Sequence, residues 1–535
     1  MLFKLAYGLY KRTLTLLERI APVEPTPLSS QQPLTGNDLA RKNREAVESV
    51  LDTAGVKPVY RQHLGERTKI FADHRQAQAL IRQLPQCIKE GVVVEATVFV
   101  MGRRRSVPAR SIPVAWLVRL FVPLSRLDEL TYYRLFGTRR DAKRYGKGFA
   151  CRIRLVTRAA DWWINPWSDV ASSPVQQEAI RRLEAPSVTD VTFPIDLVYT
   201  WVDGADPDWA DRKDAALRTL GYDVPHRSAN RSRWENRNEL LYSLRSVAMF
   251  APWVRNIFIV TDQQSPSWLN QAGNSRVRIV DHSELFQASA ALPTFNSHAI
   301  ESVLHRIDGL SEHFIYMNDD FFFGAPSQPE DFFTATGQTK VFYSNSLLPV
   351  GAPEGREKAS EWGGMNASAL LEERLGRVIT RKVKHTPLPL RRTVLGEIEE
   401  QFPDAFAHVR STQFRSHNDI APLTALYCNY AVATGHAVNV NISYAYLDIG
   451  EPLAKAKIEA YKAGAGRKVF CLNDTEEFEG GMSWEEKDSL VRDFLETLYP
   501  WRCPWERSVK QNETNATHEE VKMGQREQNS MKNVQ

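Results

Sequence analysis

Four short apolar runs between residues 194 and 320 constrain the fold of this chain more than any other feature. They are rich in β-branched side chains, as buried strands are, and they span residues 195–200, 256–261, 277–280 and 313–317. Helical patterns lie between them, notably at 238–250 and 297–307. Strands that alternate with helices predict an α/β fold with a mostly parallel, Rossmann-like sheet flanked by helices.

Acidic or polar residues follow each of the four runs. In chain order they are Asp203, Asp206, Asp208, Asp262, Asp281, His282, Asn318, Asp319 and Asp320. Open α/β sheets bind ligands at the carboxyl ends of their strands, so we expect these carboxylates to converge on one crevice and bind a divalent cation. Oxygen ligands favour Mg²⁺ or Mn²⁺. One Asp after a strand is equally often a helix cap, so the prediction rests on four strands that end alike.

Charge is unevenly distributed along the chain. Residues 1–160 carry 29 Lys and Arg against 13 Asp and Glu, and the remainder carries 39 against 51. This asymmetry predicts an anionic partner for the first part, such as a membrane surface or a polyanionic polymer, and acids that bind a cation in the second. The basic tracts at 103–105 and 139–140 lack nucleic-acid-binding motifs, so no nucleic-acid partner is expected.

The length of 535 residues requires two or more domains. The predicted order is a basic amphipathic helix (1–20), a linker (21–36), an N-terminal accessory α+β domain (37–185), a catalytic domain (190–500) and a disordered tail (505–535). The accessory domain combines a helical pattern at 38–53 with strand-like runs at 92–100 and 151–156.

No segment is expected to span a membrane, because the run 114–122 is interrupted by Arg119 and is well short of the roughly 20 residues required. Residues 1–20 lack the apolar centre of a signal peptide, which predicts a cytoplasmic protein. Two placements of the helix at 1–20 stay open: on its own domain, or in peripheral contact with the inner face of the plasma membrane.

Several motifs for other chemistries are absent from the sequence. The five cysteines form no CxxC pair, which argues against a disulfide framework or a zinc site and favours reduced, mostly buried thiols. Neither a GxxxxGK[ST] phosphate loop nor a GxGxxG turn after a strand occurs. Any phosphate must therefore be held by a metal ion and arginines.

Motifs between residues 194 and 475 resemble the four signature regions of the Stealth family, in the same order. IDLVYTWVDG at 195–204 resembles the first region. The second is matched by NEL at 238–240, YSLRS at 242–246, APWVRN at 251–256, LPTFNSHAIE at 292–301 and HFIYMNDDF at 313–321. The third is matched by HTP at 385–387 and QFRS at 413–416 with Asp419, and the fourth by FCLND at 470–474. Four signatures in order are far more specific than a single Asn-Asp-Asp.

The resemblance implies a GT-A-like fold and hexose-1-phosphate transfer in bacterial exopolysaccharide and capsule biogenesis. The family default is a UDP-sugar donor, a hydroxyl of a polysaccharide as the acceptor, and UMP as the leaving group. Phosphoryl transfer mainly needs positioning and charge neutralisation. The magnesium or manganese ion and arginines would bind the phosphate oxygens, and one base would accept the hydroxyl proton.

Matched positions then give a candidate catalytic set, which comprises Asp196, Glu301, Asp320, His385 and Arg415. Asp319 and Asp320 are the expected metal ligands. His385 is the candidate general base and Arg415 the phosphate ligand, because an imidazole titrates near neutral pH and a guanidinium fits phosphate oxygens. Asp196 lies within a buried strand run, so its carboxylate must have a partner.

A second set is expected to line the donor pocket, although each member has an ordinary packing or capping alternative: Trp201, Asn238, Arg245, Asn296, Ser297 and Asn318. Two functional alternatives stay open beside phosphotransfer. A metal-dependent glycosyltransferase would use the same acids but release UDP. A non-catalytic polysaccharide-binding protein would tolerate alanine at Asp320, His385 and Arg415.

Overall fold

The computed structural model describes residues 32–64, 67–100, 103–109, 127–136, 145–159, 162–164, 175–176, 185–220, 234–271, 276–286, 292–354, 357, 359–464, 466–474 and 481–507. The predicted helix at 1–20, most of the linker 21–36 and nearly all of the tail 505–535 lie outside these residues and stay predictions. Among the described helices, none is both long enough and apolar enough to cross a membrane. All five cysteines are buried free thiols, as predicted.

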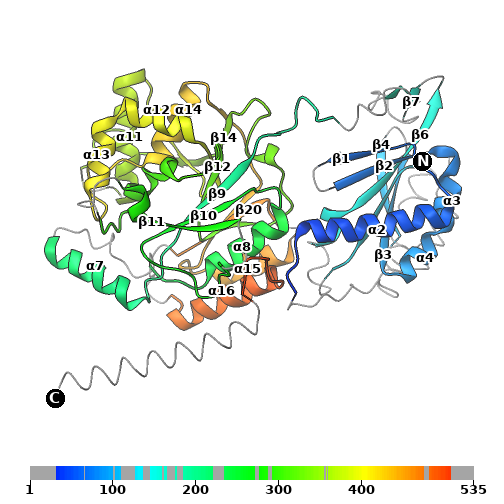
Figure 1. The fold of residues 1–535 in the computed structure, drawn as a ribbon, viewed down its shortest axis with the longest axis horizontal. Coiled ribbons are helices and arrows are strands. Elements are labelled where there is room, and N and C mark those ends of the chain that lie inside the picture. The colour runs from blue at the N-terminus through cyan, green and yellow to red at the C-terminus, as the bar shows by residue number, and fades with distance from the viewer. Residues whose placement is uncertain are drawn as a thin grey trace, which may run out of the picture.

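Among its described residues, the N-terminal part contains an eight-stranded sheet and three α-helices (Figure 1). The strands are β1 (Tyr60–Leu64), β2 (Arg67–Asp73), β3 (Val92–Val100), β4 (Arg103–Ala109), β5 (Leu127–Arg134), β6 (Cys151–Ala159), β7 (Trp162–Ile164) and β8 (Val175–Gln176). They pair in the order β1-β2-β6-β5-β3-β4, with β7 and β8 continuing from β6. Only β2 and β6 run parallel. The helices are α2 (Gly36–Ala54), α3 (Ala77–Arg82) and α4 (Leu84–Lys89).

Helix α2 has clear start and stop signals. Thr35 and Asp38 form a capping box at its start, and Gly55 adopts a left-handed conformation (φ 64°) at its end. Its buried face includes Val47 and Leu51, which pack with α3, α4 and one face of the sheet. The apolar spacing of residues 38–53 is thus explained by burial against the sheet.

The second part is built around a five-stranded sheet in the order β11-β10-β9-β12-β17. Its strands are β9 (Ile195–Thr200), β10 (Ile257–Thr261), β11 (Val277–Asp281), β12 (His313–Asn318) and β17 (Leu388–Arg391). The first four are the predicted runs, and they pair parallel to one another. Strand β17 was not predicted and pairs antiparallel with β12, so the sheet is mixed.

Alternating side chains of β9 enter two hydrophobic cores. Leu197 and Tyr199 pack on the side of α8 (Glu239–Phe250) and α16 (Trp484–Leu498), whereas Val198 packs on the other side. The second core involves α11 (Ala359–Leu375), α12 (Arg392–Gln401), α13 (Pro403–Ser411) and α14 (Cys428–Ala433). Figure 1 shows these four helices above the sheet and α8, α15 (Ala454–Ala463) and α16 below it. The sheet is the middle layer of an α/β fold.

In the part of the chain that the structure describes, three further α-helices and three small sheets surround this sheet. The helices are α7 (Pro207–Leu220), α9 (His282–Leu285) and α10 (Ser297–Glu301). One small sheet has the order β13 (Phe321–Phe323), β20 (Val469–Asn473), β19 (Tyr444–Asp448); the other two pair β14 (Thr339–Val341) with β18 (Ala437–Asn439), and β15 (Tyr343–Leu347) with β16 (Arg381–Val383). The predicted helix at 297–307 is shorter than expected: α10 ends at Glu301, and a 3-10 turn follows at Leu304–Arg306.

Candidate active site

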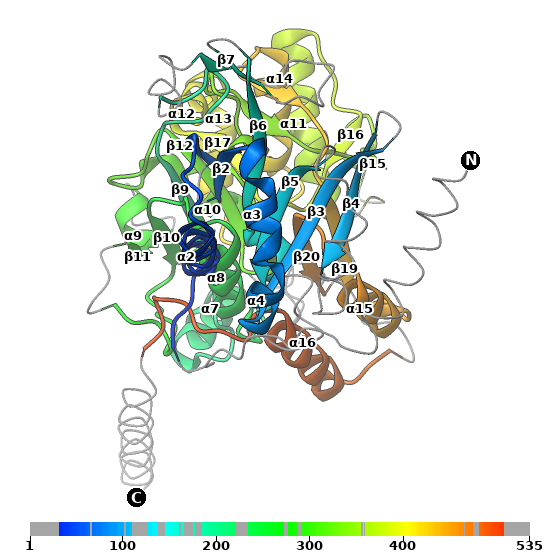
Figure 2. The same cartoon turned by 90° about the vertical axis from the view of Figure 1, so that its right-hand side faces the viewer.

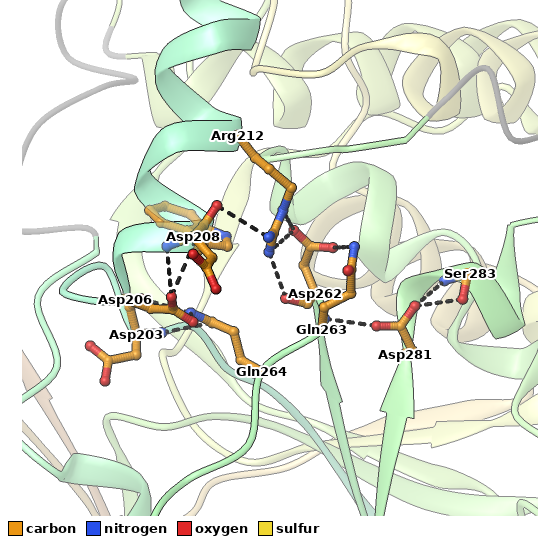
Figure 3. A network of polar contacts seen from close by, with 10 residues as sticks. Asp203, Asp206, Asp208, Arg212, Asp262, Gln263, Gln264, Asp281 and Ser283 are labelled. Carbon is orange, nitrogen blue, oxygen red and sulfur yellow. Dashed lines mark hydrogen bonds and ion pairs between the residues drawn. The ribbon is translucent and has the colours of Figure 1, made fainter. Parts of the chain in front are cut away.

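The acids that follow β9, β10 and β11 do not form the predicted cation site (Figure 3). Asp262 forms an ion pair with Arg212 of α7, with 2.9 Å between Oδ2 and Nη2. Asp281 caps α9 and also accepts a 2.7 Å hydrogen bond from the backbone N–H of Gln263. Helix α9 begins directly after β11, so Asp281 satisfies its N–H groups, whereas Asp262 follows β10 in a loop and pairs with a neighbouring cation.

The same holds for the acids after β9. Asp206 Oδ1 accepts a 2.9 Å hydrogen bond from the N–H of Asp208 at the start of α7, and Oδ2 accepts a 3.0 Å bond from Gln264. Asp203 accepts a 3.1 Å hydrogen bond from the N–H of Ala205. Three of the four acid sets therefore have local structural roles, which corrects the prediction that all four converge.

The fourth set, after β12, is different. Asp320 Oδ2 accepts a weak hydrogen bond from Cys471 Sγ at 3.3 Å, and Asp320 Oδ1 is buried without a hydrogen-bond partner. Burial raises the pKa of Asp320 to about 7, with a further contribution from the charge of Glu239. Burial and the neighbouring charge of Asp320 raise the pKa of Asp319 to about 7 as well. Within the described ranges, no Lys, Arg or His forms an ion pair with these two half-buried carboxylates.

Glu239, at the start of α8, is a third member of this cluster that sequence reasoning missed. Burial, with the charge of Asp319, raises its pKa to about 8. It accepts a 2.6 Å hydrogen bond from the backbone N–H of Arg237. The sequence did contain a signal for this residue, because Glu239 lies in the NEL motif at 238–240. A glutamate in the first turn of a helix, however, usually serves only to stabilise the positive end of the helix dipole.

A magnesium or manganese ion fits this acidic cluster. No three His, Cys, Asp or Glu side chains of the described ranges form a ready-made metal site. Mg²⁺ is usually bound by only one or two carboxylates together with water and substrate phosphates. The unpartnered Oδ1 of Asp320 and the neighbouring Asp319 are such a pair. These two residues would hold the ion.

A second cluster adjoins the acids and contains Arg415 and Glu301. Arg415 Nη2 donates a 2.5 Å hydrogen bond to Ser297 Oγ, whereas its Nε is buried without a partner. Burial raises the pKa of Glu301 to about 7, although the charge of Arg415 opposes this shift. Glu301 Oε2 is also buried without a hydrogen bond. Arg415 therefore keeps a donor free for a phosphate oxygen.

Tyr316 of β12 links the two clusters. Its hydroxyl lies 3.0 Å from Thr200 Oγ1, donates to Asn318 Oδ1 at 2.8 Å, and lies 3.5 Å from Glu301 Oε1. Burial raises the pKa of Tyr316 well above its ordinary value, and the charges of Glu301 and Asp320 add to this shift. The sequence predicts Tyr316 only as part of the strand at 313–317.

His385 follows β16 and lies beside both clusters. Its ring is 6.4 Å from that of Phe321, which directly follows Asp320, and 5.8 Å from that of Tyr446. The His385 side chain is partly exposed, but the loss of water around its ring lowers its pKa, and the charges of Lys382 and Arg415 lower it further. The imidazole is therefore neutral at pH 7 and able to accept a proton.

The structure thus brings seven of the predicted residues to the carboxyl ends of β9 and β12. They are Ser297, Glu301, Asn318, Asp319, Asp320, His385 and Arg415. A neutral base, a half-buried guanidinium and two carboxylates with one unpartnered oxygen each are together suited to chemistry on an anionic, phosphate-bearing substrate.

Asp196 is not part of this group. It lies at the opposite end of β9, four residues or about 13 Å from the carboxyl end. Its fully buried carboxylate accepts two hydrogen bonds from Arg255, at 2.8 and 2.5 Å, and one each from the backbone N–H groups of Asn256 and Ser311. The predicted partner of Asp196 is therefore an arginine rather than substrate or metal.

Replacing Asp196 by asparagine should reduce stability rather than catalysis. The change leaves Arg255 without its charged partner, and we expect the free energy of unfolding to fall by about 2–3 kcal/mol. Denaturant unfolding measures this loss, and the kcat of the folded fraction should stay within about threefold of wild type. A hundredfold lower kcat at unchanged stability would return Asp196 to the catalytic set.

Of the other four residues expected in the donor pocket, three have structural roles and the fourth, Asn238, is exposed. Arg245 forms a bidentate ion pair with Glu506, at 2.8 Å for both bonds, and so holds the C-terminal segment. Asn296 is fully buried and caps α10. Trp201 is in the hydrophobic core. Asn238 adopts a left-handed conformation (φ 62°) before α8 and is exposed. Its position next to Glu239 keeps it beside the acidic cluster.

Comparison with family models gives four matches, which follow one another along the chain. They are Stealth protein CR1, conserved region 1 (residues 193–221), CR2, conserved region 2 (233–341), CR3, conserved region 3 (384–432), and CR4, conserved region 4 (464–517). The candidate site residues of both clusters, with His385 and Cys471, fall within these regions.

Curated relatives share substantial identity with this chain. Exopolysaccharide phosphotransferase SCO6023 of Streptomyces coelicolor is 46% identical over 321 residues, which cover 60% of this chain and 54% of the relative. Exopolysaccharide phosphotransferase SCO2592 of the same organism is 33% identical over 497 residues, which cover 89% of this chain and 52% of the relative. The chain spans about half the length of these relatives.

Solved structures offer a weaker comparison. The galactosyltransferase LgtC, in complex with donor and acceptor sugar analogs, matches 56% of this chain and 95% of its own length at 9% identity. Its TM-score of 0.26 is too low to support an argument about fold or function.

Proposed function

Because the chain belongs to the Stealth family, we propose that it is an exopolysaccharide phosphotransferase that moves a hexose-1-phosphate from a UDP-sugar to a hydroxyl of a polysaccharide. The juxtaposition of neutral His385, Arg415 with its free Nε, and the unpartnered Oδ1 of Asp320 is the observation that supports this proposal most. The curated relatives carry the same activity in their names.

Each residue has a defined task in this reaction. The acceptor oxygen attacks the phosphorus nearer the sugar, the bond from that phosphorus to the bridging oxygen breaks, and UMP leaves. His385 accepts the proton of the attacking hydroxyl, since its imidazole is neutral. Arg415 binds a non-bridging phosphate oxygen through its free Nε–H, and Ser297 holds the other side of the guanidinium.

The carboxylates act through charge. Asp319 and Asp320 would hold a magnesium or manganese ion, which when bound offsets the negative charge of the diphosphate. Glu239 keeps the cluster anionic above pH 8, where it is mostly ionised. Tyr316 positions Asn318 and Glu301 between the two clusters.

The released nucleotide tests the proposal. The purified protein is incubated with Mg²⁺ or Mn²⁺, UDP-sugars and short oligosaccharides, and we expect UMP together with a product that retains phosphorus. A glycosyltransferase would instead release UDP and leave a phosphorus-free product. If neither nucleotide appears with any donor, and alanine at Asp320, His385 and Arg415 leaves polysaccharide binding unchanged, the chain is a binding protein.

The proposal also places the reaction at the cytoplasmic side of the membrane, where nucleotide-sugars are made. Contact of the basic segment 1–20 with anionic lipid is part of this proposal, and that segment lies outside the described residues.

A further inference from the structure

One face of the N-terminal sheet carries basic side chains instead of helices. Helices α2, α3 and α4 pack on the apolar face, against residues such as Ile70 and Ile153. The strand register shows which side chains lie on the opposite face. Lys69 of β2 lies beside Arg152 of β6, and Arg154 of β6 lies beside Glu129 of β5. This second face, which we call the basic sheet face, is defined by Lys69, Arg104, Arg152 and Arg154.

The four cations surround only two carboxylates. Arg104 reaches from β4 to Asp128 at 3.0 Å, and Arg154 lies 3.9 Å from the same carboxylate. Lys69, Arg152 and Arg154 share Glu129 at 3.9, 3.7 and 3.8 Å. Two further acids that the register puts on this face have cations of their own, since Glu95 is bonded to Lys147 and Asp73 to Arg75. Among the described side chains, the basic sheet face therefore has a surplus of positive charge.

Arg154 is only weakly paired within the protein. The residue is 9% exposed, its Nε has no hydrogen-bond partner, and its ion pairs with Glu129 and Asp128 are long, at 3.8 and 3.9 Å. Such long contacts compensate a desolvated guanidinium incompletely, so an anion on this face would offset its charge. Burial lowers the pKa of Lys69, and the charges of Arg154, Arg152 and Arg104 add to that shift.

The basic sheet face lies on the inner side of the N-terminal part. Figures 1 and 2 show α3 and α4 on the outer side of the sheet, away from the rest of the molecule. The opposite face is turned toward the part of the chain that contains β9–β20 and the candidate active site. A polymer held on this face would therefore run alongside the catalytic part.

We propose that the basic sheet face binds the phosphodiester-linked saccharide chain on which the enzyme acts. This inference rests on the proposed function, which produces such a chain. Guanidinium groups bind phosphate oxygens in a fork geometry, and three of the four cations are arginines. They extend over β2, β6 and β4, and neighbouring strands are about 4.8 Å apart, so the array is wider than a single phosphate requires. An extended polyanion matches it better than a free ion.

Binding of a labelled poly(glycerol phosphate) to the full chain tests the proposal, with dextran as the neutral control. We expect the double variant Lys69→Gln and Arg152→Gln to bind this polymer about tenfold more weakly at about 100 mM salt, with a shallower salt dependence. Both side chains are partly exposed, so the fold should tolerate the change. The matched control, Lys57→Gln and Lys89→Gln, removes the same charge from exposed lysines outside this face, and should bind within twofold of wild type.

Three results would overturn the proposal: equal weakening in both double variants, no weakening in either, or wild-type binding to phosphatidylglycerol vesicles but not to the polymer. The last result would identify a lipid surface instead. UMP release with a short neutral acceptor is measured separately and should be unchanged in all variants. Failure of that reaction in wild type would refute the proposed function, whereas loss of polymer binding alone would refute only this inference.

Discussion

Replacing Asp320 by asparagine should lower kcat for transfer by about 10⁴-fold, the largest effect that we expect from a single substitution. Asparagine preserves the shape of the side chain and its contact with Cys471, but removes the charge that would hold a divalent cation beside the diphosphate. The release of UMP at saturating donor, measured over a range of Mg²⁺ or Mn²⁺ concentrations, gives the value.

The same substitution should make the metal-free protein more stable at pH 8. The pKa of Asp320 is about 7 in the fold and 3.8 ordinarily, so the folded state retains a proton that the unfolded chain has lost. Stability therefore falls as the pH rises from about 4 to 7, and the asparagine variant avoids this loss. Each kcal/mol gained should raise Tm by about 2–4 °C at pH 8, and no gain is expected at pH 4.

A matched control separates this effect from a general change of charge. Asp208→Asn removes an exposed acid of α7 that follows β9, and it should change neither kcat nor Tm. Added Mg²⁺ should raise the Tm of wild type at pH 8 and leave that of Asp320→Asn unchanged, because ion binding stabilises only the form that binds it. Transfer within tenfold of wild type in Asp320→Asn would contradict a role for this carboxylate in the reaction.

The four parallel strands of the second sheet were predictable because local signals determine them. Strands β9, β10 and β12 are buried on both faces of the sheet, and a continuous apolar, β-branched run is typical of such a strand. The same reasoning failed for the acids, since Asp281 and Asp320 both follow a strand. Whether such an acid caps a helix or stays unpartnered depends on the next residues: α9 begins directly after Asp281, whereas β13 follows Asp320.

Contacts distant in sequence decided the remaining assignments. Asp196 pairs with Arg255, 59 residues away, and Arg415 reaches Ser297, 118 residues away. The spacing of apolar residues along the sequence gives no information about such distant pairs. Asp196 and Glu239 both lie in family motifs, and only the structure separates them. Arg255 donates to Asp196 at 2.8 and 2.5 Å, whereas Arg237 lies 3.9 Å from Glu239, whose pKa stays raised. Family resemblance therefore identified the motifs of the site, and the structure showed which of their residues are paired with distant partners.

Replacing His385 by asparagine should lower kcat by about 10³-fold, within the range that general-base catalysis contributes. The pKa of His385 lies below 6.5, so the wild-type rate should be constant above that pH and fall below it as the imidazole becomes protonated. Asparagine accepts no proton, so the residual rate should lose this acidic limb. The pH profile of kcat distinguishes a lost base from a merely disturbed site, which would lower the rate but keep the limb.

Two conditions make this test specific to His385. Saturating Mg²⁺ keeps Asp319 and Asp320 ionised, because their pKa values of about 7 would otherwise add an acidic limb of their own. His436→Asn, on a partly exposed histidine near Glu397, serves as the control and should retain both rate and profile. If the acidic limb persists in His385→Asn under these conditions, another group takes the hydroxyl proton. Glu301, with a pKa of about 7, is then the next candidate, because its Oε2 has no hydrogen-bond partner and it interacts with Arg415.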